Sequence, residues 1–223
     1  MEFIQARFAM TFSHDPAQLD RWNKRFSAEG YLFGKRPNAF LESQAARLRP
    51  GMSALCVADG EGRNSVWLAQ RGLHVTAFDF SPVGVAKARE LAREAGVAVD
   101  HRESDIFRWD WSARQFDVLV VIFIQFLSPV QRAEIFARFR DALKPEGLLI
   151  LQGYRPEQVA FGTGGPPQAE NMYTEDLLRE LLRDWDILHL ASHDDEVDEG
   201  AGHRGMSALI DLVARAPGSR DTP

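Results

Sequence analysis

The chain has 223 residues, of which 45% are hydrophobic and 26% are charged, with a net charge of −6 at pH 7. These values are typical of one folded globular domain and exclude a disordered chain. The acidic balance argues against a protein that tracks nucleic-acid phosphates. With a single cysteine, Cys56, no intrachain disulfide can form, which fits a reducing compartment. No apolar run reaches membrane-spanning length and the N-terminal segment lacks a signal-peptide layout, so we expect a cytoplasmic protein without membrane or nucleic-acid partners.

The first 50 residues precede any regular alternation of strands and helices. A helix is predicted at 16–28, with Asp15 as its N-cap. A loop rich in glycine and aromatic residues follows at 29–38, and a second helix is predicted at 39–48. The aromatic residues of this region either pack against a sheet as core or form a lid over a ligand, and both interpretations stay open. They are Trp22, Tyr31 and Phe33.

From residue 53 onward, short apolar runs alternate with segments of helical periodicity. Strands are predicted at 53–58, 74–79, 97–101, 116–123, 147–152, 185–192 and 206–213, and helices at 63–71, 82–95, 129–143 and 174–183. This alternation predicts an α/β fold with a doubly wound, seven-stranded, mostly parallel sheet. The polar stretch 193–204 joins the last two strands without a helix and predicts a long hairpin with an antiparallel edge strand. We therefore divide the chain into a helical lid at 1–50, a core domain at 51–215 and a flexible tail at 216–223.

The stretch Ser53–Asp79 carries the main functional signal. Its first strand ends at a turn that contains Gly60 and Gly62, a helix follows, and the second strand ends at Asp79. The glycines allow the backbone to approach a ligand closely, and the start of the helix offers unpaired N–H groups. A carboxylate at the second strand end can accept hydrogen bonds from both hydroxyls of a ribose. The sequence therefore predicts a nucleoside-type cofactor at the carboxyl edge of the sheet.

Two nucleoside cofactors compete for this site. The fingerprint for a nicotinamide dinucleotide requires a third glycine three positions after Gly62, where this chain has Ser65, so an oxidoreductase is disfavoured. S-adenosylmethionine (SAM) needs only a close backbone approach and the ribose carboxylate. Asp105 follows the third strand, where its side chain can reach an adenine amino group, and Ile106 and Phe107 can enclose the ring.

These motifs resemble those of the class I SAM-dependent methyltransferases over nearly all of 15–215. The resemblance is carried by Asp59-Gly60-Glu61-Gly62-Arg63-Asn64, Phe78-Asp79-Phe80-Ser81, Ser104-Asp105 and Leu143-Lys144-Pro145-Glu146-Gly147. More narrowly, the chain resembles the tellurite-resistance (TehB-type) branch, near the thiopurine methyltransferases. That likeness is carried by Trp22-Asn23-Lys24-Arg25-Phe26, Tyr31-Leu32-Phe33-Gly34, Pro37-Asn38-Ala39-Phe40-Leu41, Gly164-Gly165-Pro166, Met172-Tyr173-Thr174 and Glu199-Gly200-Ala201-Gly202-His203-Arg204-Gly205.

The resemblance implies a Rossmann-like methyltransferase fold, SAM as the cofactor and a set of cofactor-binding residues. They are Trp22, Arg25, Ala58, Asp59, Gly60, Gly62, Arg63, Asn64, Asp79, Phe80, Ser81, Asp105, Ile106, Phe107 and Ile122. Two residues depart from the family pattern. Cys56 stands where the first strand usually carries an acid, and Ala58 stands where the first motif glycine is expected. Asp59 is the candidate substitute for the missing contact to the methionine ammonium group.

Methyl transfer is an in-line displacement at a sulfonium carbon, so alignment and exclusion of water matter more than a charged site. A general base is needed only when the acceptor arrives protonated, whereas oxyanions and thiolates need only cationic or N–H groups to position them. The candidates for the acceptor side are Gln125, Arg155, His203 and Tyr31, with Arg25 and Arg36 as further cations that could position an anion. Gln125 lies at the end of the fourth strand, Arg155 follows the fifth, and His203 stands in the late glycine-rich loop.

The sequence thus predicts methyl transfer from SAM to a small soft or anionic acceptor, such as tellurite, selenite or a thiol. The alternative is a non-catalytic SAM-sensing or partner-binding module, which the departures at Cys56 and Ala58 keep open. The long loop at 153–173 is either functional or a mobile surface connection. The acidic run at 194–199 is most simply a solvated loop, so no metal site is predicted.

Overall fold

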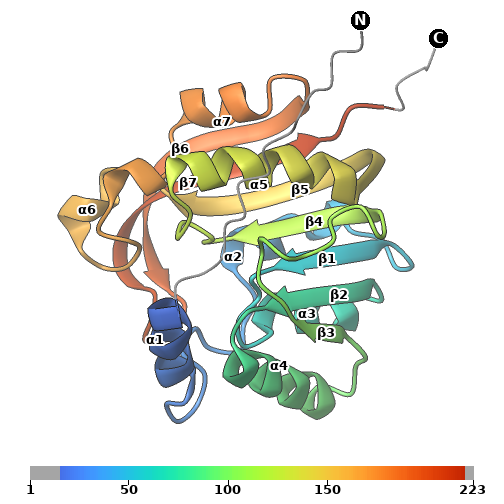
Figure 1. Cartoon of the computed structure of the whole chain (residues 1–223), viewed down its shortest axis with the longest axis vertical. Helices are drawn as coiled ribbons and strands as arrows, with labels where there is room; N and C mark the ends of the chain where they lie inside the picture. The colour runs from blue at the N-terminus through green and yellow to red at the C-terminus, as the bar shows by residue number, and fades with distance from the viewer. Residues whose placement is uncertain (1–15, 219–223) are drawn as a thin grey trace, which may run out of the picture.

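Seven strands form one sheet, in the order β3-β2-β1-β4-β5-β7-β6, in the computed structural model, which describes residues 16–218 (Figure 1). The strands are β1 (Ser53–Val57), β2 (His74–Asp79), β3 (Asp100–Glu103), β4 (Phe116–Ile122), β5 (Leu143–Tyr154), β6 (Asp186–Asp198) and β7 (Arg204–Arg215). The strands from β3 to β5 pair in parallel, whereas β7 is antiparallel to both β5 and the edge strand β6. The predicted doubly wound, mostly parallel sheet with an antiparallel edge is therefore confirmed.

Helices cover both faces of this sheet. They are α1 (Pro16–Phe26), α2 (Ala39–Ser43), α3 (Arg63–Gln70), α4 (Pro82–Glu94), α5 (Pro129–Ala142), α6 (Gln158–Phe161) and α7 (Glu175–Leu181), with short 3₁₀ turns η1 (Ala45–Arg47) and η2 (Ala169–Asn171). In Figure 1, α5 crosses the near face and α3 lies behind the sheet. The helix α1 stands beside the edge toward which the arrowheads of β1, β2 and β4 point, so it is placed to cover a site at the strand ends.

The central strands are buried on both faces, which explains their unbroken apolar runs. Leu55 and Val57 pack into the core under α5 and α7, whereas Ala54 and Cys56 face the core under α2 and α3. Cys56 is fully buried among these apolar side chains, which is the environment of a structural cysteine.

Most predicted elements match the structure to within a few residues, and the differences have local causes. The strand predicted at 147–152 begins earlier, because Leu143 pairs with Phe116 across an irregularity in the β4 ladder. The helix predicted at 39–48 splits, because Gln44 N–H bonds to the carbonyl of Leu41 at 3.1 Å and tightens the last turn. The long loop after β5 holds the short elements α6 and η2.

Some predictions fall outside residues 16–218. They are the N-cap at Asp15, the character of the N-terminal segment and the tail at 219–223. Within the described part, Ala216 is buried against the main core rather than free of it. None of the helices of residues 16–218 is long and apolar enough to cross a membrane.

Candidate functional site

The turn after β1 contains two glycines, Gly60 and Gly62, and the structure gives a different reason for each. Gly60 and Gly62 have φ angles of 61° and 90°, in the left-handed region, and Ala58 adopts 49° despite its side chain. A Cβ on Gly62 would lie 2.8 Å from Ala88 of α4, so this glycine allows α3 and α4 to pack closely. Gly60 is the glycine that faces the ligand side, where a Cβ would meet the Phe26 ring at 3.3 Å.

Asp79 ends β2 with a buried carboxylate that the backbone holds in place. Its Oδ2 accepts a hydrogen bond from Gly60 N–H at 3.0 Å, and its Oδ1 accepts one from Ser81 N–H at 2.8 Å. Burial raises the pKa of Asp79 to about 6, although these N–H groups oppose the shift. Each oxygen keeps lone-pair capacity for a further donor, so the carboxylate can still bind a pair of hydroxyls.

Asp59 is a second buried acid beside Asp79. Both of its carboxylate oxygens are buried and no hydrogen bond of standard geometry reaches them from residues 16–218, although the hydroxyl and N–H of Ser65 lie close enough to act against the rise in pKa. Burial raises the pKa of Asp59 to about 7, and the charge of Asp79 adds to the shift. Buried carboxylate oxygens without a partner destabilise the folded protein. A ligand that brings hydrogen-bond donors or positive charge would therefore bind favourably here.

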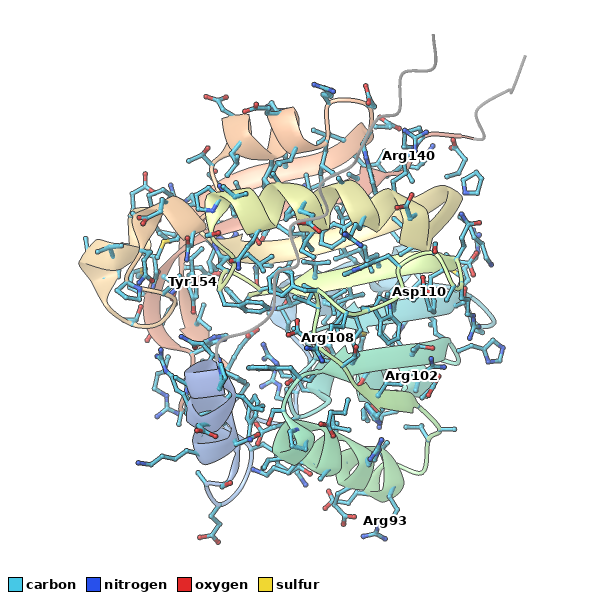
Figure 2. The ribbon with its side chains drawn as sticks, viewed as in Figure 1. Arg93, Arg102, Arg108, Asp110, Arg140 and Tyr154 are labelled. Carbon is cyan, nitrogen blue, oxygen red and sulfur yellow. The ribbon has the colours of Figure 1, made fainter. Side chains whose placement is uncertain are left out.

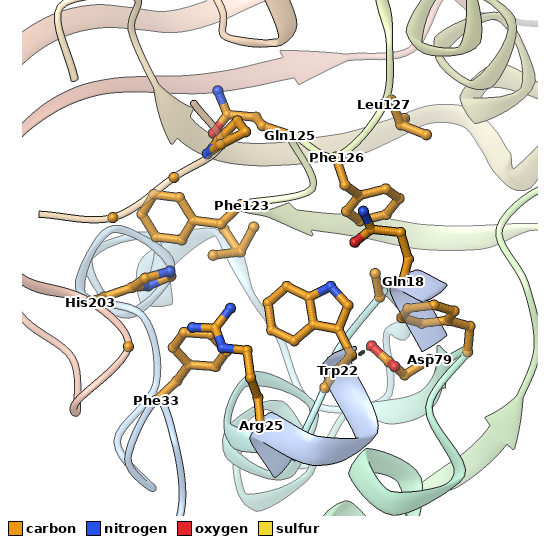
Figure 3. A pocket seen from close by; sticks show the side chains of 18 of the residues that line it. Gln18, Trp22, Arg25, Phe33, Asp79, Phe123, Gln125, Phe126, Leu127 and His203 are labelled. Atoms are coloured by element: carbon orange, nitrogen blue, oxygen red, sulfur yellow. Dashed lines mark hydrogen bonds between the residues drawn. The ribbon is translucent and has the colours of Figure 1, made fainter. Parts of the chain in front are cut away.

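A pocket of about 580 Å³ opens where the ends of β1, β2 and β4 meet α1 (Figure 3). The predicted cofactor residues that line it are Trp22, Arg25, Ala58, Asp59, Gly60, Arg63, Asn64, Asp79, Phe80, Phe107 and Ile122. This volume lies in the range of pockets that hold a ligand of cofactor size. Figure 3 shows Asp79 at one end of the pocket and His203 at the other.

Four predicted cofactor residues do not line the pocket. They are Gly62, Ser81, Asp105 and Ile106. Ser81 caps α4 by accepting a hydrogen bond from Gly84 N–H at 3.1 Å, and Asp105 accepts one from Phe107 N–H at 2.9 Å. They therefore hold elements of the site in place from behind it.

The helix α1 and the loop after it cover the pocket. Trp22 packs on Phe26 with ring centroids 5.3 Å apart, and the guanidinium of Arg25 lies 4.4 Å from the Trp22 ring. Lys87 of α4 holds the end of α1, because its Nζ donates to the carbonyls of Phe26 and Ala28 at 2.7 and 3.0 Å. Since these contacts place aromatic rings over the strand ends, the lid interpretation of α1 is favoured by the geometry.

The cover is completed by a turn that is distant in sequence. Gly202 N–H donates to the carbonyl of Leu32 at 3.0 Å. A Cβ on Gly200 would lie 2.6 Å from the backbone of Gly34 and of Leu32. The turn between β6 and β7 therefore rests directly on the loop that follows α1.

The acceptor-side candidates separate in the structure. Gln125 and His203 line the pocket, whereas Arg155 and Tyr31 do not. Gln125 uses its amide on the backbone of Tyr154, to which it donates and from which it accepts at 2.6 Å, so it fixes the end of β5.

The two candidates outside the pocket have other partners. Arg155 forms an ion pair with Asp194 of β6. The ring of Tyr31 lies under the Nζ atoms of Lys35 and Lys87, at 4.8 and 5.3 Å.

An aromatic enclosure surrounds His203, and sequence reasoning missed most of it. The imidazole centroid lies 4.4 Å from that of Phe33, 4.5 Å from that of Phe123 and 5.9 Å from that of Tyr154. The hydroxyl of Tyr154 is buried without a hydrogen-bond partner in the described part of the chain. Phe123 adopts a φ of 55°, a left-handed backbone conformation that no pattern in the sequence predicts.

Comparison with known proteins relates part of this chain to methyltransferases. Residues 54–147 match the family model described as a methyltransferase domain. An uncharacterised protein of Mycobacterium tuberculosis is 34% identical over 149 residues, which cover 61% of this chain and 54% of the relative. A glycine/sarcosine N-methyltransferase of Halorhodospira halochloris is 30% identical over 137 residues, which cover 58% of this chain and 47% of that enzyme. The chain thus spans about half the length of the curated relatives it matches.

Among solved structures, TehB of Haemophilus influenzae superimposes with a TM-score of 0.63 at 18% identity, covering 89% of this chain and 67% of that one. The fold is the Rossmann-like methyltransferase fold. The family match covers residues 54–147 and the relatives include methyltransferases, in agreement with a SAM-binding methyltransferase domain. At 18% identity the TehB likeness is one of fold, so the narrower tellurite branch stays a proposal.

Proposed function

We propose that this protein transfers the methyl group of SAM to a small acceptor held beside His203 under α1. The observation that carries the proposal is the pair of buried acids at the strand ends, Asp59 and Asp79, whose oxygens keep free acceptor capacity. SAM brings hydroxyl donors on its ribose and positive charge on its ammonium and sulfonium groups. These groups fit two carboxylates that are buried at the end of a pocket of cofactor size.

Different residues are placed to bind different parts of SAM. Asp79 is placed for the ribose hydroxyls and Asp59 for the ammonium group. Phe80 and Phe107 line the pocket and can enclose the adenine. When bound, SAM supplies a methyl group activated by the positive charge on sulfur.

The lid contributes by excluding water and aligning the acceptor. Trp22 and Phe26 lie over the strand ends, so a closed lid removes solvent from the path between the two ligands. Displacement neutralises the sulfonium, and a drier pocket favours that loss of charge. The lid therefore serves catalysis as well as binding.

For the acceptor we propose a small soft or anionic molecule, with a thiol, selenite and tellurite as the first choices. Arg25 supports this proposal, because it lines the pocket and forms no ion pair with a carboxylate of residues 16–218. A second candidate is an amino-acid amine, since the same guanidinium can bind a carboxylate and relatives include a glycine/sarcosine N-methyltransferase. Turnover of any acceptor would exclude a SAM-sensing module without catalysis.

The first test measures binding of S-adenosylhomocysteine (SAH) by calorimetry and transfer of radiolabel from SAM to tellurite, selenite, 2-mercaptoethanol, glycine and sarcosine. We expect SAH to bind, and Asp79→Ala to weaken it at least tenfold, because charge-assisted hydrogen bonds contribute about 1.5–3 kcal/mol each. Asp110→Ala is the matched control, since Asp110 is exposed and lies at the opposite end of the sheet from Tyr154 (Figure 2). Wild-type protein that binds neither SAH nor SAM would contradict the proposal.

A further inference from the structure

Glu199 is a buried carboxylate in the turn between β6 and β7, next to the acceptor end of the pocket. Its Oε1 accepts hydrogen bonds from Asn38 Nδ2 at 2.9 Å and from Ala39 N–H at 3.0 Å. Its Oε2 accepts one from Arg63 Nη2 at 2.6 Å. Burial acts to raise the pKa of Glu199, but the nearby imidazole of His203, the charge and hydrogen bond of Arg63 and the N–H of Ala39 outweigh it and lower the pKa to about 2. The side chain is thus a fixed anion at every working pH.

A buried polar network ties this anion to the sheet. Asn38 Nδ2 also donates to Gln152 Oε1 at 2.6 Å, and Gln152 Nε2 donates to Asp211 Oδ1 at 2.6 Å. Asn38 in addition caps α2, where its Oδ1 accepts from Leu41 N–H at 3.0 Å. A buried network with satisfied partners specifies one conformation, so Glu199 has little freedom to move.

His203 faces Glu199 with one ring nitrogen. Its Nδ1 is buried and lies 3.8 Å from Glu199 Oε2, with no hydrogen-bond partner in the described part of the chain. That separation is too long for a hydrogen bond, but a shift of less than 1 Å closes it, and such bonds often tighten only when ligands bind. Figure 3 shows the imidazole reaching into the pocket.

The surroundings of His203 decide its protonation state. Burial lowers its pKa, Glu199 raises it, and the charges of Arg63 and Arg25 lower it, with a net lowering. The rings of Phe33, Phe123 and Tyr154 also lie against the imidazole. At neutral pH the imidazole is therefore uncharged and able to take up a proton.

We infer that Glu199 is a positioning residue that holds His203 with Nδ1–H toward its carboxylate and with the Nε2 lone pair open to the acceptor, so that His203 acts as the general base. The inference rests on the proposed methyl transfer. The acceptor atom forms a bond to the methyl carbon while the carbon–sulfur bond breaks and its electron pair stays on sulfur. The proton of the acceptor atom passes to Nε2, and the resulting imidazolium lies beside the Glu199 carboxylate.

This assignment narrows the acceptor class. A base is useful only for a nucleophile that arrives with its proton, such as a thiol, an amine or a hydroxyl. A fully ionised oxyanion has no proton to give and gains nothing from His203 in this state. The dyad therefore favours thiols and amines over tellurite and selenite among the proposed acceptors.

The decisive measurement is the tautomer of His203, read from the ¹⁵N shifts of its ring nitrogens in the full-length protein at pH 7.5 with and without SAH. His203→Asn identifies its signals. We expect Nδ1 protonated and Nε2 bare in the wild type, and loss of that preference in Glu199→Gln. Glu175→Gln is the matched control, because Glu175 is paired with Arg179 on the exposed side of α7. An Nε2–H tautomer or an imidazolium in the wild type would overturn the inference, and this reading is made on the wild-type protein itself.

Kinetics with 2-mercaptoethanol give the second readout. We expect kcat to fall by about 100-fold or more in His203→Asn, the usual range for a lost general base, while SAH affinity stays within threefold. In Glu199→Gln we expect a smaller fall in kcat, little change in KM and a shifted pH profile. An unchanged pH profile in folded Glu199→Gln would overturn the positioning role. Absence of SAH binding would instead defeat the proposed function, and the tautomer would still decide the dyad.

Discussion

At the scale of single residues, the site is built on acids that the fold leaves unneutralised. Asp59 and Asp79 are buried side by side with pKa values raised to about 7 and 6, which is unfavourable in a protein without ligand. The sequence indicated Asp79 through its place at a strand end, and Asp59 as a substitute acid. The raised pKa of both depends on burial, which composition and spacing do not reveal.

From the raised pKa values of these acids we predict that a rise in pH lowers the stability of the ligand-free protein and raises its affinity for SAH and SAM. A carboxyl whose pKa is raised on folding contributes stability that is fully present below its unfolded value near 4 and is lost as the pH rises through 6 to 7. Wild-type protein without ligand should therefore lose on the order of 2–3 kcal/mol between pH 4 and 7.5 relative to Asp79→Asn, by urea unfolding. SAH and SAM affinity should rise over the same interval, because the ionised acids bind the ligand. Parallel stability curves for the two proteins would contradict this prediction.

At the scale of elements, α1 is held in place mainly by α4. Lys87 Nζ bonds to the end of α1 and also to Glu61 Oε1 at 2.7 Å, and the Glu61 side chain is only 3% exposed. The periodicity of residues 16–28 predicted the helix and left its role open. Its position beside the pocket depends on this anchoring, which joins residues about 60 positions apart and cannot be read from local sequence.

Removing that anchor should open the lid. Lys87→Met leaves the buried Glu61 without its cation, and breaking such a pair costs about 3–5 kcal/mol when fully buried, somewhat less here because Lys87 is partly exposed. We expect a clear loss in urea unfolding and faster dissociation of SAH in stopped-flow measurements. Lys35→Met is the control, because its pair with Glu94 is solvent-exposed and contributes little to stability. Equal effects of the two variants would argue against α4 as the anchor.

At the scale of the whole molecule, the sequence predicted the mostly parallel sheet well. It predicted the end of the pocket near His203 only in part. Alternating patterns suffice for a parallel sheet, because buried strands and amphipathic helices have distinct periods. The insertion of β7 between β5 and β6, and the contact of its preceding turn with the lid loop, arise from long-range packing. The sequence identified His203 as a candidate, but the groups that bury and fix Glu199 four residues before it, Asn38, Ala39 and Arg63, come from distant segments.

The junction between the lid loop and the 200–203 turn provides a test at this scale. Gly200→Ala adds a Cβ 2.6 Å from backbone atoms of the lid loop and also strains a φ of 75°. Gly30→Ala is a close control, because its φ is 74° and no atom lies within 4 Å of the added Cβ. We expect Gly200→Ala to lose about 1–3 kcal/mol more in urea unfolding than Gly30→Ala, and to weaken SAH binding. Indistinguishable variants would show that the two segments do not depend on each other.

The junction between the lid loop and the 200–203 turn also links entry of the acceptor to the position of His203. Residues 32–34 contact both the cover of the pocket and the turn that carries His203, so a movement of this loop that admits an acceptor also shifts that turn. Acceptor entry and the placement of His203 are therefore coupled through one contact between two distant segments.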